Sequence, residues 1–212
     1  MKQVVGLVGF AGSGKDTAAS LFRKGGYQQD SFAAPLKDVI SQIFSWDRGM
    51  VEGGTKESRE WREQPDAYWS EAFGYPVIPR VVLQKFGTES MRDVFHDDIW
   101  VKSLIRRIQM SSNKKFVISD ARFQNEVQAI QEMGGIILRI RRGPEPNWFL
   151  VADQANRGNP DAIRHMIELG IHRSEWDWIG CEFDYVIENN GTLSEFETQL
   201  RKIVDRKHLV LV

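Results

Sequence analysis

Short apolar runs alternate with amphipathic stretches along most of the chain. The runs have the length of buried β-strands and fall at residues 4–8, 27–32, 116–120, 136–140 and 185–188. Between them, apolar residues recur with the spacing of one buried helix face, as in the series Val101, Leu104, Ile105 and Ile108. Strands that alternate with helices predict an α/β fold, a three-layer sandwich in which helices cover both faces of a parallel central sheet.

Two stretches interrupt this alternation. Residues 45–75 contain several tryptophans among many charged residues and show weak periodicity, whereas residues 143–180 are interrupted by prolines. We expect one helix to begin at Pro79 and to stop at Gly87, and another to lie near 161–169. The sequence therefore predicts a single domain over residues 1–212, with insertions at about 45–78 and about 143–180.

The composition is that of an ordinary globular protein and narrows the choice of partners. Of the 212 residues, 42% are hydrophobic and 27% are charged, and the net charge of -1 gives no general attraction to nucleic acid or to an anionic membrane. The lone Cys181 excludes an internal disulfide, and the histidines lack the spacing of metal ligands. With no export signal and no apolar membrane span, we expect a cytoplasmic protein that binds neither nucleic acid nor membrane.

The segment from Gly9 to Thr17 has the pattern G-x-x-x-x-G-K and joins the first predicted strand to a predicted helix. Glycines in such a loop let backbone N–H groups surround phosphate oxygens, and Lys15 adds a positive charge at the helix N-terminus. A glycine-rich turn with a solvated lysine is the alternative, but the order of strand, loop and helix favours phosphate binding. Asp16 stands where Ser or Thr normally binds magnesium, and Thr17 follows one place later.

Asp120 and Arg122 follow the strand at 116–120, so we expect them at the same sheet edge as the phosphate loop. Asp120 could hold Mg²⁺ through water or accept a hydrogen bond from a sugar hydroxyl, and Arg122 could grip a phosphate. The alternative is that Asp120 caps the helix at 123–133.

Several other cations lie near the ends of predicted elements and are candidates for neutralising phosphate charge: Lys37, Arg80, Arg92, Arg142 and Arg173. Arg107 is expected to be solvated, and Arg139 and Arg141 to face solvent from an edge strand.

In their order and spacing, these motifs resemble the deoxynucleoside monophosphate kinases of tailed bacteriophages, within the wider nucleoside monophosphate kinase group. The resemblance covers most of the chain and rests on the Lys15-Asp16-Thr17 ending of the loop together with ordered blocks at 34–38, 83–89, 100–102, 120–126, Arg142 and 172–175. It implies the P-loop NTPase fold, with a helical lid at about 143–180 and the acceptor-binding insertion at about 45–78.

The resemblance also implies roles for individual residues. The ATP phosphates would be bound by Gly12, Ser13, Gly14, Lys15, Asp16 and Thr17, with Thr17, or Asp16 through water, serving Mg²⁺. Catalysis would involve Lys15, Asp16, Arg122 and Arg142. The acceptor nucleotide would be surrounded by Lys37, Arg80, Gln84, Gly87, Thr88, Trp100, Asp120, Arg122, Asn125 and Glu126. For Trp100 a plain core role is an equal alternative, and residues 189–191 either contact adenine through their backbone or form a simple turn.

The function that follows is transfer of a phosphoryl group from ATP to a deoxynucleoside monophosphate. A P-loop kinase for another small acceptor, such as dephospho-coenzyme A or phosphomevalonate, is one alternative, and a non-catalytic nucleotide-sensing module is another. The acceptor arginine in 45–75 stays open between Arg48, Arg59 and Arg62, and the sequence does not decide whether the chain forms a homodimer.

Overall fold

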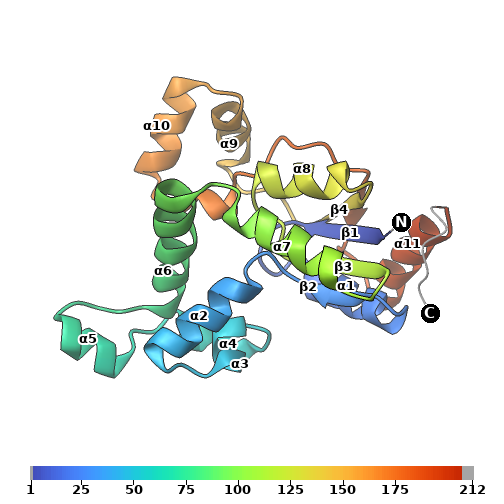
Figure 1. Cartoon of the computed structure of the whole chain (residues 1–212). Helices are drawn as coiled ribbons and strands as arrows, with labels where there is room; N and C mark the ends of the chain where they lie inside the picture. The colour runs from blue at the N-terminus through green and yellow to red at the C-terminus, as the bar shows by residue number, and fades with distance from the viewer. Residues whose placement is uncertain (1, 207–212) are drawn as a thin grey trace. The chain divides into compact units, whose positions relative to one another are not determined.

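The computed structural model describes residues 2–206 of the chain, and the side chains of residues 2–203. Within this range, five parallel strands form one sheet in the order β2-β3-β1-β4-β5 (Figure 1). Their bounds are Gln3–Val8 (β1), Gln28–Asp30 (β2), Lys115–Ile118 (β3), Ile136–Arg141 (β4) and Tyr185–Glu188 (β5). The predicted parallel sheet is confirmed, with β1 at its centre.

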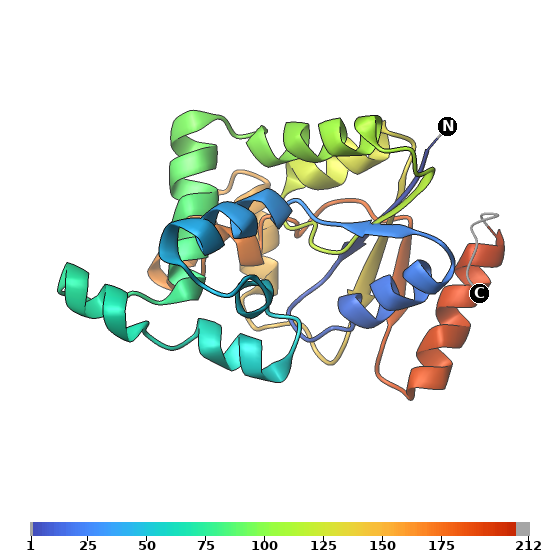
Figure 2. The ribbon, with the colours of Figure 1, turned by 60° about the horizontal axis from the view of Figure 1, so that its bottom comes forward.

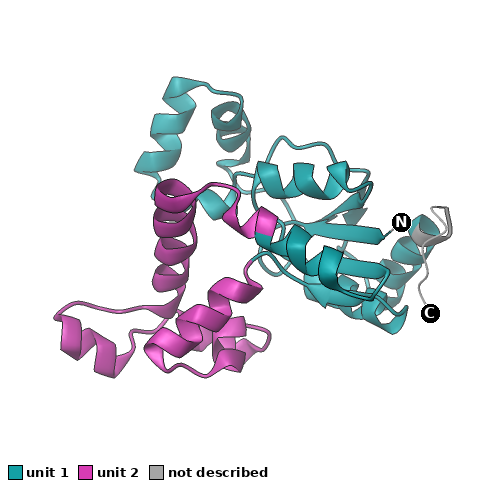
Figure 3. Cartoon of the chain, in the orientation of Figure 1, with its two compact units in different colours: residues 1–32, 103–212 teal, residues 33–102 magenta. Residues whose placement is uncertain are grey.

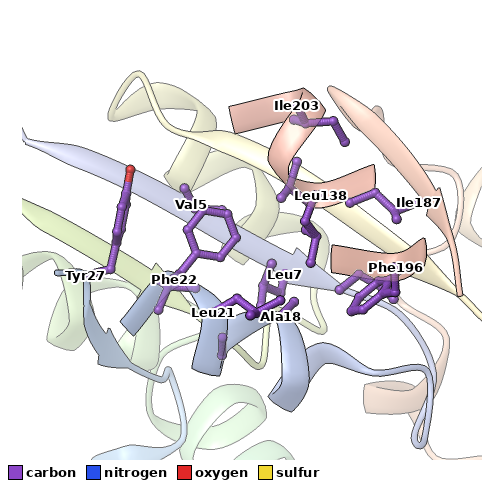
Figure 4. Close-up of a cluster of buried hydrophobic side chains, with 14 residues drawn as sticks. Val5, Leu7, Ala18, Leu21, Phe22, Tyr27, Leu138, Ile187, Phe196 and Ile203 are labelled. Atoms are coloured by element: carbon purple, nitrogen blue, oxygen red, sulfur yellow. The ribbon is translucent and has the colours of Figure 1, made fainter. Parts of the chain in front are cut away.

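Helices cover both faces of this sheet, as the alternating pattern predicts. Two of them, α1 (Lys15–Lys24) and α11 (Leu193–Arg206), lie on one face, and α7 (Ile99–Met110) and α8 (Gln124–Glu132) lie on the other (Figure 2). Phe22 and Phe196 from the first pair pack with Leu7 and Leu138 of the sheet into a fully buried core (Figure 4). This burial of apolar surface is the main stabilisation of the sandwich and fixes where β1 delivers the loop that follows it.

The chain divides into two compact units, residues 1–32 with 103–212 and residues 33–102 (Figure 3). The first unit holds the sheet, together with α9 (Phe149–Asn156), α10 (Pro160–Glu168) and the 3₁₀ turn η2 (Arg173–Glu175). The second unit is helical and consists of α2 (Ala34–Phe44), α3 (Arg48–Glu52), α4 (Lys56–Arg62), α5 (Ala67–Phe73), α6 (Pro79–Gln84) and the π-helix η1 (Lys85–Phe95).

The stretch 45–75 shows weak periodicity because it folds into three helices of only five to seven residues. Each of these helices begins with a side-chain cap, supplied by Asp47, Thr55 and Asp66. Such short helices cannot be stable alone, so caps and tertiary packing hold them. The tryptophans provide that packing, since the indole of Trp46 stacks on Phe44 with the ring centroids 4.4 Å apart.

The prediction that a helix stops at Gly87 is wrong. The helix that begins at Pro79 continues without a break into the π-helix η1, which ends at Phe95. Gly87 serves close packing rather than termination, because a Cβ there would approach a methyl group of Leu36 to 2.7 Å. Its carbonyl also accepts a hydrogen bond of 2.8 Å from the indole of Trp100. The sequence analysis also missed α9, whereas the helix expected near 161–169 is confirmed as α10.

Three arginines expected in solvent or at a ligand have structural partners instead. Arg139 does not face solvent from an edge strand, because β4 lies between β1 and β5 and the guanidinium packs 5.0 Å from the ring centre of Phe149. Arg107 binds both carboxylate oxygens of Asp30, at 2.9 and 3.1 Å. Arg92 is buried and donates to the carbonyl of Asp97 at 2.6 Å.

Among the described residues, no helix combines the length and apolarity that crossing a membrane requires.

Candidate active site

The loop between β1 and α1 is shaped by glycines that no other residue could replace without strain. Gly9 and Gly14 have φ angles of 145° and 109°, in the region that favours glycine. A Cβ at Gly9 would lie 2.3 Å from the carbonyl oxygen of Ile140, and a Cβ at Gly14 would lie 2.3 Å from the side-chain Nδ2 of Asn189. The loop is therefore packed tightly between its neighbours, which fixes the direction of its backbone N–H groups.

Asn189, which follows β5, fastens the loop from the side. Its side-chain Nδ2 donates to the carbonyl of Ser13 at 2.8 Å, and its backbone N–H donates to the carbonyl of Arg141 at 2.7 Å. This side-chain role was missed in the sequence, where Asn189 was assigned only backbone contacts or a turn. A capping box lies beside it, in which Thr192 and Glu195 each accept from the backbone N–H of the other.

Lys15 is the first residue of α1 and folds back over the loop. Its Nζ donates to the carbonyls of Gly9 at 2.7 Å and Phe10 at 2.9 Å. Burial, followed by repulsion from the nearby Arg122, lowers the pKa of Lys15 to about 8, and carboxylates around it offset part of this effect. The side chain is thus a cation held at the loop with its charge poorly compensated, which suits it to an incoming phosphate.

The loop between β3 and α8 places Asp120 and Arg122 in the electrostatic field of Lys15, as the sequence predicts for this sheet edge. The alternative that Asp120 caps α8 is wrong, because the helix begins at Gln124 and its N-cap residue is Phe123. Asp120 Oδ1 accepts from the backbone N–H of Phe32 at 2.8 Å. Glu126 supplies the cap instead: it is buried and accepts from the backbone N–H groups of Arg122 at 2.7 Å and Phe123 at 3.2 Å. Glu126 therefore fixes the backbone from which Arg122 projects.

A small pocket of about 80 Å³ lies beside the loop, lined by Phe10, Ala11, Gly12, Ser13, Arg139, Arg142 and other residues at the end of β4. The hydroxyl of Ser13 is buried and has no hydrogen-bond partner among the described residues. A buried hydroxyl without a partner is costly, so it suits a ligand oxygen bound in the loop. Arg142 is exposed and forms no ion pair with any described residue, which leaves its guanidinium available.

The residues expected to serve magnesium, Asp16 and Thr17, are both exposed in the first turn of α1. Among the described residues, no group of three or more His, Cys, Asp or Glu side chains is placed to hold a metal ion by itself. The exposed side-chain oxygens of Asp16 and Thr17 are of the kind that binds Mg²⁺, which keeps several waters and is held through one or two protein ligands together with substrate phosphates.

The other predicted acceptor residues, apart from Asn125 beside the Glu126 cap, lie in the second unit. Lys37 and Arg48 share one carboxylate, since each donates to a different oxygen of Glu52 at 2.5 Å. Arg80 pairs with Glu63 at 2.9 Å. Gly87 and Thr88 are buried in η1, and Gln84 is the last residue of α6. Trp100 is buried and its indole is hydrogen-bonded to the carbonyl of Gly87, so it has a core position.

The segment 143–180, predicted as a lid, contains a helical hairpin. Helices α9 and α10 pack against each other through small residues such as Ala152 and Ala162. The amide of Asn156 donates to three carbonyls of the following turn, those of Trp176, Asp177 and Ile179. These hydrogen bonds hold the C-terminal part of the segment against α9.

The parallel sheet, the loop after β1 and the partly buried Lys15 define a P-loop protein with a phosphate-binding site at the carboxyl end of β1. No family model matches the chain. It is 31% identical over 217 residues, covering 95% of this chain and 96% of the relative, to a protein of Acanthamoeba polyphaga mimivirus named "Putative deoxynucleotide monophosphate kinase". The chain therefore belongs to the deoxynucleotide monophosphate kinase family.

Solved structures similar to the chain include other small-molecule kinases. A dephospho-CoA kinase from Campylobacter jejuni is 15% identical, with 97% of both chains covered and a TM-score of 0.44. A shikimate kinase from Aquifex aeolicus is 13% identical, with 97% of this chain and 98% of that chain covered and a TM-score of 0.42.

Proposed function

We propose that the protein transfers the γ-phosphoryl group of ATP to a deoxynucleoside 5′-monophosphate, giving ADP and a deoxynucleoside diphosphate. The observation that carries this choice of acceptor is the viral relative, whose similarity extends over nearly the whole of both chains. The same proposal places the reaction in the cytoplasm, where both nucleotides are present.

The donor half of the reaction is assigned to the first unit. Backbone N–H groups from Gly12 to Thr17 hold the phosphates of ATP, and the hydroxyl of Ser13, which has no partner within the described part of the chain, gives the loop a further donor. Lys15 and Arg122 offset the charge that spreads over the transferring group, and the exposed Arg142 is available for the same purpose. Bound through Thr17 or Asp16, Mg²⁺ would add charge neutralisation at the phosphates.

The acceptor half is assigned to the second unit, where the contacts favour Arg48 over Arg62. Arg48 and Lys37 flank the same carboxylate of Glu52, so their charges lie close enough together to bind one phosphate. Arg62 packs its guanidinium against Gly53 instead, since a Cβ there would lie 2.2 Å from that group. The acceptor phosphate is the nucleophile and is largely ionised near neutral pH, so no protein side chain is needed as a nucleophile.

A panel of acceptors separates this function from its alternatives. We expect purified protein with γ-labelled ATP and Mg²⁺ to label one or more of the four common deoxynucleoside monophosphates in a saturable manner. Separate parallel reactions contain an alternative acceptor instead: dephospho-coenzyme A, phosphomevalonate or a ribonucleoside monophosphate. Saturable transfer to one of the first two, with none to any nucleoside monophosphate, would overturn the assignment, and tight ATP binding without any transfer would favour a nucleotide-sensing module.

A further inference from the structure

The turn η2, at the end of the segment 143–180, is joined to the β3–α8 loop by contacts of several kinds. Glu175 Oε1 accepts from Nη1 of Arg122 at 3.0 Å. Two residues farther on, Asp177 accepts from the backbone N–H of Gln124 at 2.9 Å. The guanidinium of Arg173 lies 5.6 Å from the ring centre of Phe123 and also binds Asp177 at 2.7 Å. Because these contacts act together, the pair of Glu175 and Arg122 has a defined geometry.

Three carboxylates face the two cations of the donor site, and they come from three elements. Asp16 belongs to α1, Asp120 to the β3–α8 loop and Glu175 to η2, and all three act electrostatically on Lys15. Asp16 is exposed beside the phosphate loop, and Asp120 accepts from the backbone of Phe32. Of the three, Glu175 is the carboxylate that forms an ion pair with Arg122.

The geometry of this pair leaves Arg122 able to bind a ligand. Its side chain keeps 40% of its surface exposed, whereas the side chain of Glu175 keeps 20%. A guanidinium has five N–H donors in a rigid plane, so the bond from Nη1 to Glu175 fixes the orientation of the plane while other donors stay available.

We propose that Glu175 is a positioning residue for phosphoryl transfer, holding the guanidinium of Arg122 toward the phosphates bound by the loop. The inference rests on the proposed kinase function of the same site. Glu175 itself needs no contact with substrate in this role. Because η2 ends the segment 143–180, the same contact makes the orientation of Arg122 depend on how that segment is docked.

Replacing the carboxylate while keeping its size tests the proposal. We expect Glu175→Gln to lower kcat by about tenfold or more, because a displaced catalytic group loses transition-state contacts. ATP affinity and the melting temperature should stay close to those of the wild type. The matched control is Glu168→Gln, which removes the same charge from an exposed position on α10 of the same segment and should leave kcat unchanged.

A double-mutant cycle distinguishes positioning from a merely structural role. If Glu175 acts through Arg122, then Glu175→Gln should cause less than about a twofold further loss once Arg122→Met is present. An equal loss in both backgrounds, or a wild-type kcat for Glu175→Gln, would overturn the inference. If Glu175→Gln does not fold, Glu175→Asp takes its place in the cycle, because it keeps the charge but shortens its reach.

The split between kcat and KM gives a second readout that a structural role would not move. A displaced Arg122 guanidinium should lower kcat while the KM for ATP stays within about twofold of the wild-type value. The proposed function is checked separately by the wild type. If the wild type phosphorylates no deoxynucleoside monophosphate, the proposed function fails, and the cycle is run with the acceptor that the wild type does use. If the wild type phosphorylates a deoxynucleoside monophosphate but Glu175 and Arg122 are uncoupled, the inference alone fails.

Discussion

Lys15 shows how one side chain is prepared for phosphate by what surrounds it. Its Nζ is held by two loop carbonyls, while burial and Arg122 make its positive charge unfavourable. An anion bound in the loop relieves both effects, since it supplies the missing negative charge. The lysine was predictable from the motif, but its lowered pKa was not, because that depends on residues more than 100 positions away in the sequence.

The pKa of about 8 leads to a test by pH. In the free enzyme Lys15 is charged below this pH and loses its proton as the pH rises through it, so ATP binding should be strongest below pH 8. Above it, we expect the affinity to fall by up to about tenfold per pH unit, measured by calorimetry between pH 6.5 and 9.5.

Lys15→Arg is the matched variant for this measurement. A guanidinium stays protonated throughout the range, so the fall in affinity should disappear in this variant even if its affinity is lower overall. An affinity of the wild type that is the same at pH 7 and pH 9.5, or a fall that persists in Lys15→Arg, would contradict the assignment.

At the scale of elements, the strands and most long helices were predictable because their periodicity is local. The short helices of 45–75 and the π-helix η1 were not, since side-chain caps and packing against distant residues determine them. Gly87 illustrates the difference: the sequence suggests a helix end, whereas the contact with Leu36 shows why a glycine is needed inside a helix.

The β5–α11 loop gives a prediction at this scale. Asn189→Ala removes the hydrogen bond to the carbonyl of Ser13 and leaves that partly buried carbonyl without its partner, at a cost of about 1 to 2 kcal/mol. We expect the melting temperature to fall and ATP to bind roughly tenfold more weakly, because the loop loses its lateral support. Asn147→Ala, at an exposed position, is the control and should change neither quantity. Equal behaviour of the two variants would show that Asn189 does not support the loop.

At the scale of the whole molecule, the residues proposed for the donor and those proposed for the acceptor belong to different compact units. The phosphate loop, Asp120 and Arg122 belong to the sheet unit, whereas Lys37, Arg48 and Glu52 belong to the helical unit. The phosphate loop could be predicted because a strand, the loop and a helix follow one another within residues 3–24. The link of Arg48 to Lys37 through Glu52 and that of Glu175 to Arg122 could not, because they depend on side-chain contacts between separate elements.

The central claim is that the loop at Gly9 to Thr17 delivers the phosphoryl group of ATP to a deoxynucleoside monophosphate. The most direct measurement compares the wild type with Lys15→Ala for transfer of label from γ-labelled ATP to that acceptor, with folding checked by circular dichroism. We expect labelled deoxynucleoside diphosphate from the wild type, and a rate of transfer lower by about a hundredfold or more from a folded Lys15→Ala variant. Near-normal transfer by Lys15→Ala, or no labelled deoxynucleoside diphosphate from the wild type, would contradict the account.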